Sequence, residues 1–260
     1  MRIVRVEHQG EIFHGILEDQ RVTRITGNLF SDFQVIDQSY QLKEVKLLAP
    51  LVPVNIIAIG LNYRKHAIET GKPIPTKPVI FLKATSSLIG PEEPIRLPKQ
   101  HADEVDFEAE LAIVIGKIAK DLSPEEALDY VLGYTCANDV SARDCQHRLD
   151  VQWARGKSFD TFCPLGPWIE TELDPNNQGI RTRINGITMQ DSNTQDMIFS
   201  VKEIISYCSQ NMTLLPGTVI LTGTPEGVGT ARKPPVYLKD GDIVEVEIEG
   251  IGVLRNSVIK

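Results

Sequence analysis

Asp106-Phe-Glu-Ala-Glu-Leu-Ala-Ile-Val-Ile-Gly116 is the most informative run of this sequence, because it predicts a buried strand whose first residues carry two acidic side chains. Side chains along a strand alternate between its faces, so Glu108 and Glu110 are expected side by side, roughly 6.5 to 7 Å apart. Leu111 to Ile115 are apolar, and like charges beside a core repel each other and are costly to desolvate. A divalent metal ion between the carboxylates would remove that conflict. The alternative is a solvated glutamate pair at the mouth of the strand, which discourages edge pairing.

The composition is that of a globular protein with one large domain, or one domain and a small appendage. The chain has 260 residues, of which 42% are hydrophobic and 24% charged. Its net charge of −8 argues against nucleic acid or an anionic membrane as the main partner, because both attract basic surfaces.

No segment predicts a membrane span or a secretion signal. No apolar run approaches the ~18 residues of a span, and Arg2, Arg5 and Glu7 interrupt the N-terminus where a signal peptide needs apolar residues. We therefore expect a cytoplasmic protein. The cysteines show no Cys-x-x-Cys spacing, so we expect buried or inert thiols rather than zinc ligands at Cys136, Cys145, Cys163 and Cys208.

Short strands dominate the predicted secondary structure of the first part of the chain. A Pro-bounded segment at residues 50–53 follows three predicted strands, at residues 2–6, 11–17 and 21–25. We expect a small N-terminal β domain at residues 1–50 and a larger domain at residues 51–260.

The larger domain is expected to begin with an apolar strand at residues 55–60. Residues 62–69 are expected to form a short helix or a mobile stretch, and several prolines make residues 84–104 largely irregular. Ser123, Pro124 and Glu126 form a capping box that predicts a helix to about Val131.

The rest of the chain again alternates short elements with turn signals. Asn185-Gly186 is a strong signal for a two-residue hairpin loop between residues 181–184 and 187–190. Ser200 and Glu203 form a second capping box. Further predicted elements are a strand at 134–138, a helix at 200–210, a strand at 218–221 and a closing hairpin of 243–248 with 252–258. Sustained alternation of strand and helix is missing, which argues against a doubly wound sheet and predicts a β-rich α+β fold of roll or barrel type.

Asp139 offers a third carboxylate, at the end of the predicted strand 134–138. Three carboxylates with positions left for water and substrate suit Mg²⁺ or Mn²⁺, which prefer oxygen ligands in octahedral geometry. The alternative is that Asp139 caps the turn that follows it.

Two further segments offer groups for an anionic substrate. Lys157 follows a glycine in a polar loop and, near a metal ion, would hold a carboxylate or steady an enolate. Its alternative is a surface lysine. The run Thr222-Gly-Thr-Pro-Glu-Gly-Val-Gly229 is similar to a backbone cradle in which N–H groups and the Thr224 hydroxyl bind a carboxylate. It has neither the Lys-Ser/Thr ending of a P-loop nor a GxGxxG order, so nucleotide binding is disfavoured.

His66 and Glu69 are three residues apart, which places them on one face if residues 62–69 are helical. They are a candidate general base and the carboxylate that orients it. The alternative is an exposed polar pair.

Four motifs together, in this order, resemble the fumarylacetoacetate hydrolase family: Asp106-Phe-Glu-Ala-Glu-Leu111, Asn138-Asp-Val-Ser-Ala-Arg-Asp-Cys-Gln146, Gly156-Lys-Ser-Phe-Asp160 and Leu221-Thr-Gly-Thr-Pro-Glu-Gly-Val-Gly229. The resemblance covers roughly residues 55–258. It implies a mixed β-sandwich roll, usually a homodimer, which would follow the small N-terminal β domain that the strands of residues 1–50 predict.

The resemblance also implies roles for individual residues. Glu108, Glu110 and Asp139 would bind Mg²⁺ or Mn²⁺, while Gln146, Lys157 and Thr224 would face the substrate. The segment from Gly60 to Glu69 is similar to the lid of smaller members, in which a His and a Glu form the acid/base pair.

The chain departs from true fumarylacetoacetases in being far shorter, which puts fumarylacetoacetate in doubt as the substrate. It is more similar to compact bacterial-type members that act on acylpyruvates, oxaloacetate-like acids or hydroxyheptadienedioates. Our leading hypothesis is therefore a metal-dependent enzyme that cleaves a C–C bond in a small 2-oxo acid, by hydrolysis or decarboxylation. The alternatives are an isomerase of 2-hydroxyhepta-2,4-diene-1,7-dioate type and, from another class, a non-catalytic metal-binding protein of the same fold.

Overall fold

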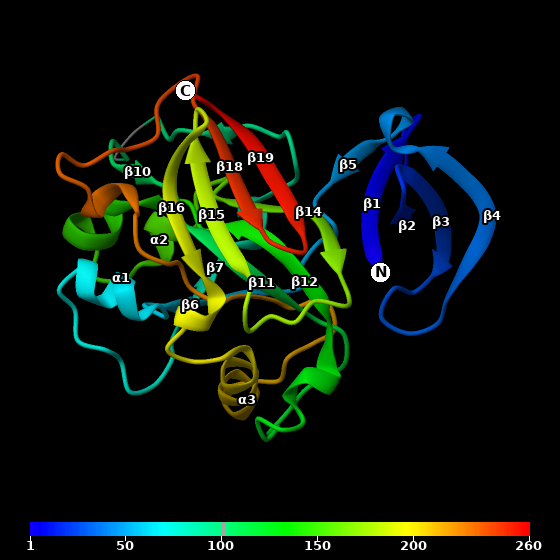
Figure 1. Ribbon diagram of the computed structural model, residues 1–260, viewed down its shortest axis with the longest axis horizontal. Helices are drawn as coiled ribbons and strands as arrows, with labels where there is room; N and C mark the ends of the chain where they lie inside the picture. The colour runs from blue at the N-terminus through cyan, green and yellow to red at the C-terminus, as the bar shows by residue number, and fades with distance from the viewer. Residues whose placement is uncertain (100–101) are drawn as a thin grey trace.

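The computed structural model describes residues 1–99 and 102–260 and shows a β-rich α+β fold (Figure 1). The predicted fold class is therefore confirmed. Part of the segment expected to be irregular, residues 100 and 101, lies outside the described residues.

The first strands form an antiparallel meander beside the rest of the molecule, drawn in blue in Figure 1. β1 hydrogen-bonds to β14 of the main part, so the meander continues the large sheet. Three of its strands match the predictions and two were missed. The five are β1 (Arg2–His8), β2 (Glu11–Glu18), β3 (Arg21–Gly27), β4 (Phe33–Gln41) and β5 (Lys46–Leu48). The division into two domains at residue 50 stays a prediction.

The large sheet runs in the order β4-β3-β2-β1-β14-β12-β11-β17-β6-β7, with β5 paired to β1 and β8 to β14. Its remaining strands are β6 (Ile56–Gly60), β7 (Val79–Lys83), β8 (Leu88–Ile89), β11 (Ala109–Ile115), β12 (Val131–Asn138), β14 (Cys163–Glu170) and β17 (Val219–Leu221).

β11 is buried on both faces, as its apolar sequence predicts. Leu111 and Ile113 belong to one apolar cluster, whereas Ala112 and Val114 belong to a second cluster on the other face. Glu110 has the same parity as Ala112 and Val114, so it faces the second side of the sheet. The register of this strand thus directs a carboxylate into a covered part of the molecule.

A smaller sheet packs against β11 and β12 through their other face. It has the order β16-β15-β18-β19-β9, and Val246 and Ile248 of β18 share the apolar cluster of Leu111. The predicted loop Asn185-Gly186 joins β15 to β16, with both residues at positive φ as a type I′ turn requires. The strands are β9 (Ile95–Arg96), β15 (Gly179–Ile184), β16 (Ile187–Asn193), β18 (Ile243–Ile248) and β19 (Gly252–Ile259), and a separate pair joins β10 (Val105–Asp106) to β13 (Ser141–Ala142).

Helices are short, and one predicted helix is wrong. Ser123 and Glu126 do form the predicted side-chain contact at 2.7 Å, but only turns and the 3₁₀ helix η3 (Ala127–Tyr130) follow. The α-helices are α1 (Arg64–Glu69), α2 (Ala154–Lys157) and α3 (Val201–Asn211), which the Ser200–Glu203 capping box opens. Single turns occur at η1 (Leu42–Glu44), η2 (Thr85–Ser87), η5 (Thr194–Asp196) and η6 (Gly229–Ala231), and a π-helix, η4, at Cys145–Leu149.

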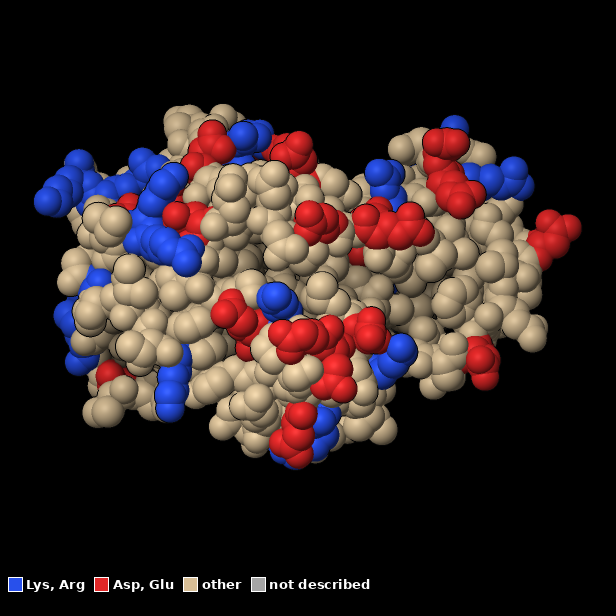
Figure 2. All heavy atoms as spheres, turned by 60° about the horizontal axis from the view of Figure 1, so that its bottom comes forward, with Lys and Arg blue, Asp and Glu red and all other residues tan. Residues whose placement is uncertain are grey.

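The charged side chains of the face in Figure 2 include both signs, with acidic groups along its middle and basic groups gathered at one end. Within residues 1–99 and 102–260, no helix has the length and apolar character needed to cross a membrane.

Candidate active site

Three buried carboxylates converge where β11 begins and β12 ends. Ala109 pairs with Asn138, so Glu108 and Asp139 adjoin the same end of the two strands, and the Asp139 N–H donates to the Glu108 carbonyl at 2.9 Å. One oxygen from each of Glu108, Glu110 and Asp139 lies within 4.8 Å of the other two. Their exposed fractions are 6%, 1% and 0%, so the alternative of solvated glutamates is wrong.

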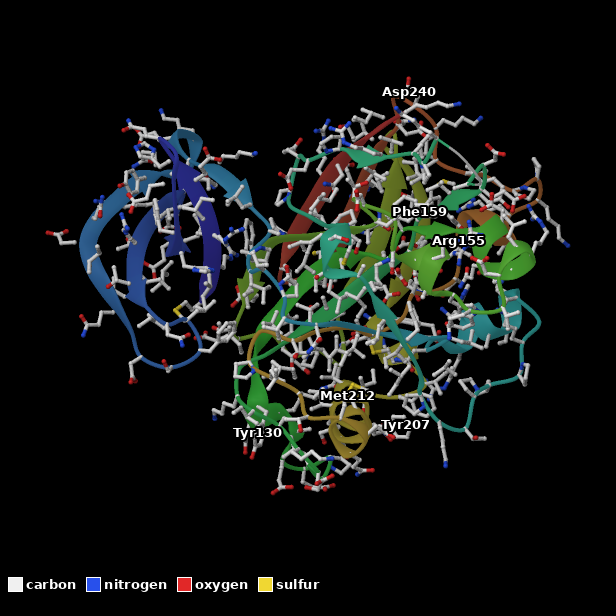
Figure 3. All side chains as sticks on the ribbon, turned by 180° about the vertical axis from the view of Figure 1, so that it is seen from behind. Tyr130, Arg155, Phe159, Tyr207, Met212 and Asp240 are labelled. Carbon is white, nitrogen blue, oxygen red and sulfur yellow. The ribbon has the colours of Figure 1, made fainter. Side chains whose placement is uncertain are left out.

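Lys157 reaches this carboxylate triad from α2, the helix that contains Arg155, which is labelled in Figure 3. Its Nζ lies 2.8 Å from Glu108 and 2.5 Å from Asp139. Lys157 is buried, so its alternative as a surface lysine is wrong.

The Asp139 side chain binds a second lysine and does not cap the turn that follows it. Lys83 of β7 donates to its Oδ1 at 2.6 Å, and no backbone N–H donates to its side chain in residues 1–99 and 102–260. Asp139 is therefore part of the charge cluster, and its alternative as a capping residue is wrong.

The charges of the cluster do not cancel. Four carboxylates, Asp106, Glu108, Glu110 and Asp139, meet three cations, Lys83, Arg143 and Lys157. Burial would raise the pKa of Glu108, but the guanidinium of Arg143 and the ammonium of Lys157 outweigh it and hold that pKa well below its usual range.

Glu110 is the carboxylate of the cluster that forms no ion pair with these cations. Burial, with Asp139 and Glu108 nearby, raises the pKa of its carboxyl well above the usual value. Among the described residues, its hydrogen-bond partner is the Gly223 N–H at 2.6 Å. A triad of oxygen donors with one surplus negative charge fits a hard divalent cation, which would hold all three carboxylates ionised.

Backbone N–H groups of the Gly-rich loop bind three of the chain's own carboxylates, and a role of this loop toward the substrate stays a prediction. Gly223 N–H donates to Glu110, Gly227 N–H to Glu69 at 2.9 Å, and Gly229 N–H to Asp106 at 2.7 Å. Gly223 has φ of +96°, and a Cβ there would lie 2.7 Å from the Cβ of Asn62, so only glycine fits.

Thr224 lines the cavity above the triad, but its hydroxyl is already engaged. It donates to the Ala109 carbonyl at 2.9 Å and accepts from the Gln190 amide at 2.8 Å. These bonds fix the loop to the start of β11.

His66 and Glu69 form the predicted pair on α1, with His66 Nδ1 3.0 Å from Glu69 Oε2. Their side chains are 12% and 23% exposed, so they are largely covered. The second carboxylate oxygen of Glu69 accepts the Gly227 N–H, which fixes α1 against the Gly-rich loop.

The predicted site residues surround a single cavity. It is lined by His66, Glu108, Glu110, Asp139, Gln146, Lys157 and Thr224. Glu69 does not line the cavity, but it is hydrogen-bonded to His66, which does. Gln146 is buried and accepts from Arg143 at 2.9 Å.

Sequence reasoning missed five titratable residues around the site: Lys72, Lys83, Asp106, Arg143 and His147. Asp106 and Arg143 lie inside two of the quoted motifs, so their position beside the candidate ligands was the available signal. Lys83 ends a strand 56 residues before its partner Asp139, and no local pattern connects them.

A family model described as "Fumarylacetoacetate (FAA) hydrolase C-terminal" matches residues 55–259. The chain belongs to the fumarylacetoacetate hydrolase family. A second model, described as "Rv2993c-like, N-terminal", matches residues 1–50.

Members of the fumarylacetoacetate hydrolase family with named activities are similar to this chain. An "oxaloacetate tautomerase fahd2, mitochondrial" from Xenopus laevis is 52% identical over 220 residues, which cover 83% of this chain and 69% of that protein. The structure of a 5-carboxymethyl-2-hydroxymuconate delta-isomerase from Mycobacterium smegmatis is 44% identical, with a TM-score of 0.91 and coverage of 100% and 99%. A fumarylacetoacetate hydrolase from Exiguobacterium antarcticum is 42% identical, with the same TM-score and coverage. The chain is thus an enzyme of this family, which argues against the non-catalytic alternative.

Proposed function

We propose that this enzyme uses a divalent metal ion to form an enolate from a small 2-oxo acid of the oxaloacetate class. The observation that carries the proposal is the position of a histidine–carboxylate pair at the same cavity as a buried, under-neutralised carboxylate triad. The relatives named as oxaloacetate tautomerases support the substrate class.

Glu108, Glu110 and Asp139 would hold the ion. Three carboxylates without nitrogen or sulfur donors favour Mg²⁺ or Mn²⁺ over zinc. When bound, the ion would supply Lewis-acid polarisation of the substrate's 2-oxo group.

His66 would take or return the proton at the carbon next to the oxo group. Glu69 would orient the imidazole through Nδ1, which leaves Nε2 for proton transfer. Lys157 and Gln146 would face the substrate's oxygen atoms, and Thr224 would position the loop beside them.

Two outcomes can follow the enolate. Cleavage of a C–C bond, by hydrolysis or decarboxylation, is the outcome that the sequence predicts. A proton shift without cleavage is the second candidate, and relatives named as a tautomerase and an isomerase favour it.

A substrate panel with Mg²⁺ tests the proposal. Oxaloacetate, acylpyruvates and 2-hydroxydienoates would be incubated with wild type and with Glu110→Gln, and the products identified by NMR. We expect turnover of oxaloacetate by wild type and its loss in Glu110→Gln or with a chelator. No turnover of any 2-oxo acid would overturn the proposal, whereas pyruvate formation would distinguish cleavage from a proton shift.

We also propose that the enzyme is a homodimer in the cytoplasm, with residues 1–50 as an N-terminal domain. The family resemblance supports the dimer, and the separate match of residues 1–50 supports the domain boundary.

A further inference from the structure

The active-site cavity is lined by more basic side chains than the chain pairs with carboxylates. Four lysine, arginine or histidine side chains line it: Lys72, Arg143, His147 and Lys157. Arg143 and Lys157 are paired with the carboxylates Asp106, Glu108 and Asp139.

Lys72 and His147 have no such partner. Within residues 1–99 and 102–260, neither side chain makes an ion pair or a hydrogen bond. Lys72 lies three residues beyond the end of α1, and His147 belongs to the π-helix Cys145–Leu149, so two separate segments bring them to the same cavity. Both keep contact with solvent, which places them at its mouth.

The electrostatics agree with a local excess of positive charge. Burial, with Arg143 and Lys72 nearby, lowers the pKa of His147 to about 4, and burial with Arg143 lowers the pKa of Lys72. At neutral pH, His147 is thus an uncharged hydrogen-bond donor at the same cavity as Lys72.

The cavity therefore has two ends of opposite character. Its inner end has the carboxylate triad, and its mouth has Lys72 and His147. A ligand that fits both ends has a chelating 2-oxo acid group at one end and an anion at the other.

We propose that Lys72 and His147 bind the second carboxylate of the substrate and so select dicarboxylic 2-oxo acids over monocarboxylic ones. This inference rests on the proposed function, because it assumes that the 2-oxo acid end lies at the triad. Lys72 would contribute charge and His147 a directed hydrogen bond.

The binding of two non-reacting 2-hydroxy acids tests whether the mouth of the cavity recognises a second carboxylate, without depending on catalysis. Malate and lactate share the chelating end, and only malate has a second carboxylate. Their dissociation constants would be measured by calorimetry with Mg²⁺ present for wild type, Lys72→Gln, Lys72→Arg and His147→Gln. Lys77→Gln is the matched control, because Lys77 is exposed in the same loop and does not line the cavity.

We expect wild type to prefer malate, and Lys72→Gln to reduce that preference roughly 10-fold, the value of one charge-assisted hydrogen bond. Lys72→Arg should restore it, His147→Gln should reduce it, and Lys77→Gln should leave it unchanged. An unchanged preference in both Lys72→Gln and His147→Gln would overturn the inference, as would a wild type that does not distinguish the two acids or binds neither. Preference for malate without turnover of oxaloacetate would instead count against the proposed function alone.

Discussion

The guanidinium of Arg143 joins two buried carboxylates, with Nε 2.8 Å from Asp106 and Nη2 2.6 Å from Glu108. Asp106 also accepts the N–H groups of Gly229 and Thr230. One buried cation thus connects a candidate metal ligand to the end of the Gly-rich loop.

Replacing Arg143 is predicted to be strongly destabilising. Arg143→Met would keep much of the volume but leave the buried Asp106 carboxylate without its ion-pair partner and Glu108 with Lys157 alone, so the free energy of unfolding should fall by about 3–5 kcal/mol. Urea denaturation measures the change. Arg255→Met is the control, because its ion pair with Glu92 is exposed and should contribute less than about 1 kcal/mol. Equal losses in both variants would contradict the prediction.

Metal binding is predicted to release a proton. Because the pKa of Glu110 is raised, its carboxyl keeps a proton to a higher pH than a free glutamate does, and the metal ion must displace it. The affinity for Mg²⁺ or Mn²⁺ should therefore rise with pH. Calorimetry in buffers of different ionisation enthalpy measures the released protons and should show one site per chain, with a dissociation constant on the order of micromolar to millimolar.

The control for metal binding is Glu125→Ala, which alters an exposed glutamate that does not line the cavity and should bind the metal as wild type does. Glu110→Ala should lose the site. Unchanged binding in Glu110→Ala, or an affinity that falls with rising pH, would exclude the assignment.

Glu69→Gln is predicted to impair the chemical step without affecting metal binding. Glutamine still accepts the Gly227 N–H, so the contact between α1 and the loop survives while the charge that orients His66 is lost. The turnover number should fall roughly 10²- to 10⁴-fold. His66→Ala should behave similarly, and the double variant should be little worse than either, because residues that act as one unit are non-additive.

Glu226→Gln serves as the control for the pair, since Glu226 lies in the same loop but pairs with Lys65 outside the cavity. Its turnover should stay near that of wild type. If His66→Ala and Glu69→Gln both keep full turnover of every active substrate, the base lies elsewhere.

The free energy of unfolding is predicted to decrease as the pH falls, in part because His14 becomes protonated more readily in the unfolded state. Burial lowers the pKa of His14 below the 6.5 of a free histidine, despite its contact with the Pro50 carbonyl at 3.2 Å. The folded state therefore disfavours protonation of His14. The contribution of neutral His14 to the free energy of unfolding is complete above pH 6.5 and is lost as the pH falls below that value. Between pH 7.5 and 5.5, the unfolding free energy of wild type should decrease more than that of His14→Gln. Identical decreases would show that His14 does not titrate differently in the two states.

The homodimer predicts a mass near twice 28.9 kDa by light scattering at micromolar concentration. A mass near 28.9 kDa across that range would favour a monomer.

Local periodicity predicted the parts of the site that depend on one or two strands. Glu108 and Glu110 are close because they are two residues apart, and the capping residues of α3 and the loop at Asn185-Gly186 are short-range signals that the structure confirms. The third carboxylate, Asp139, meets them because β12 pairs with β11.

Long-range contacts could not be predicted in the same way. Lys83 and Asp139 meet only because β7 and β12 lie in the same sheet, and nothing near either residue specifies the other. β14 was missed because Pro164, Gly166 and Pro167 are typical of a loop, although β12 and β1 both pair with this strand. The predicted helix after Ser123 was wrong because a capping contact does not determine how far a helix continues.

Eight consecutive residues, from Gly223 to Thr230, hold groups that would perform different tasks: Glu110 of the triad, Glu69 of the base pair and Asp106 behind Arg143. The loop therefore fixes the distances between these three carboxylates, because all of them are hydrogen-bonded to one short segment of backbone. Lys72 and His147, by contrast, form no hydrogen bond or ion pair with this loop in the described residues, so substitutions at the mouth need not alter that spacing. A lineage of such enzymes can exchange one substrate for another at the mouth while the distances between its reacting groups stay constant.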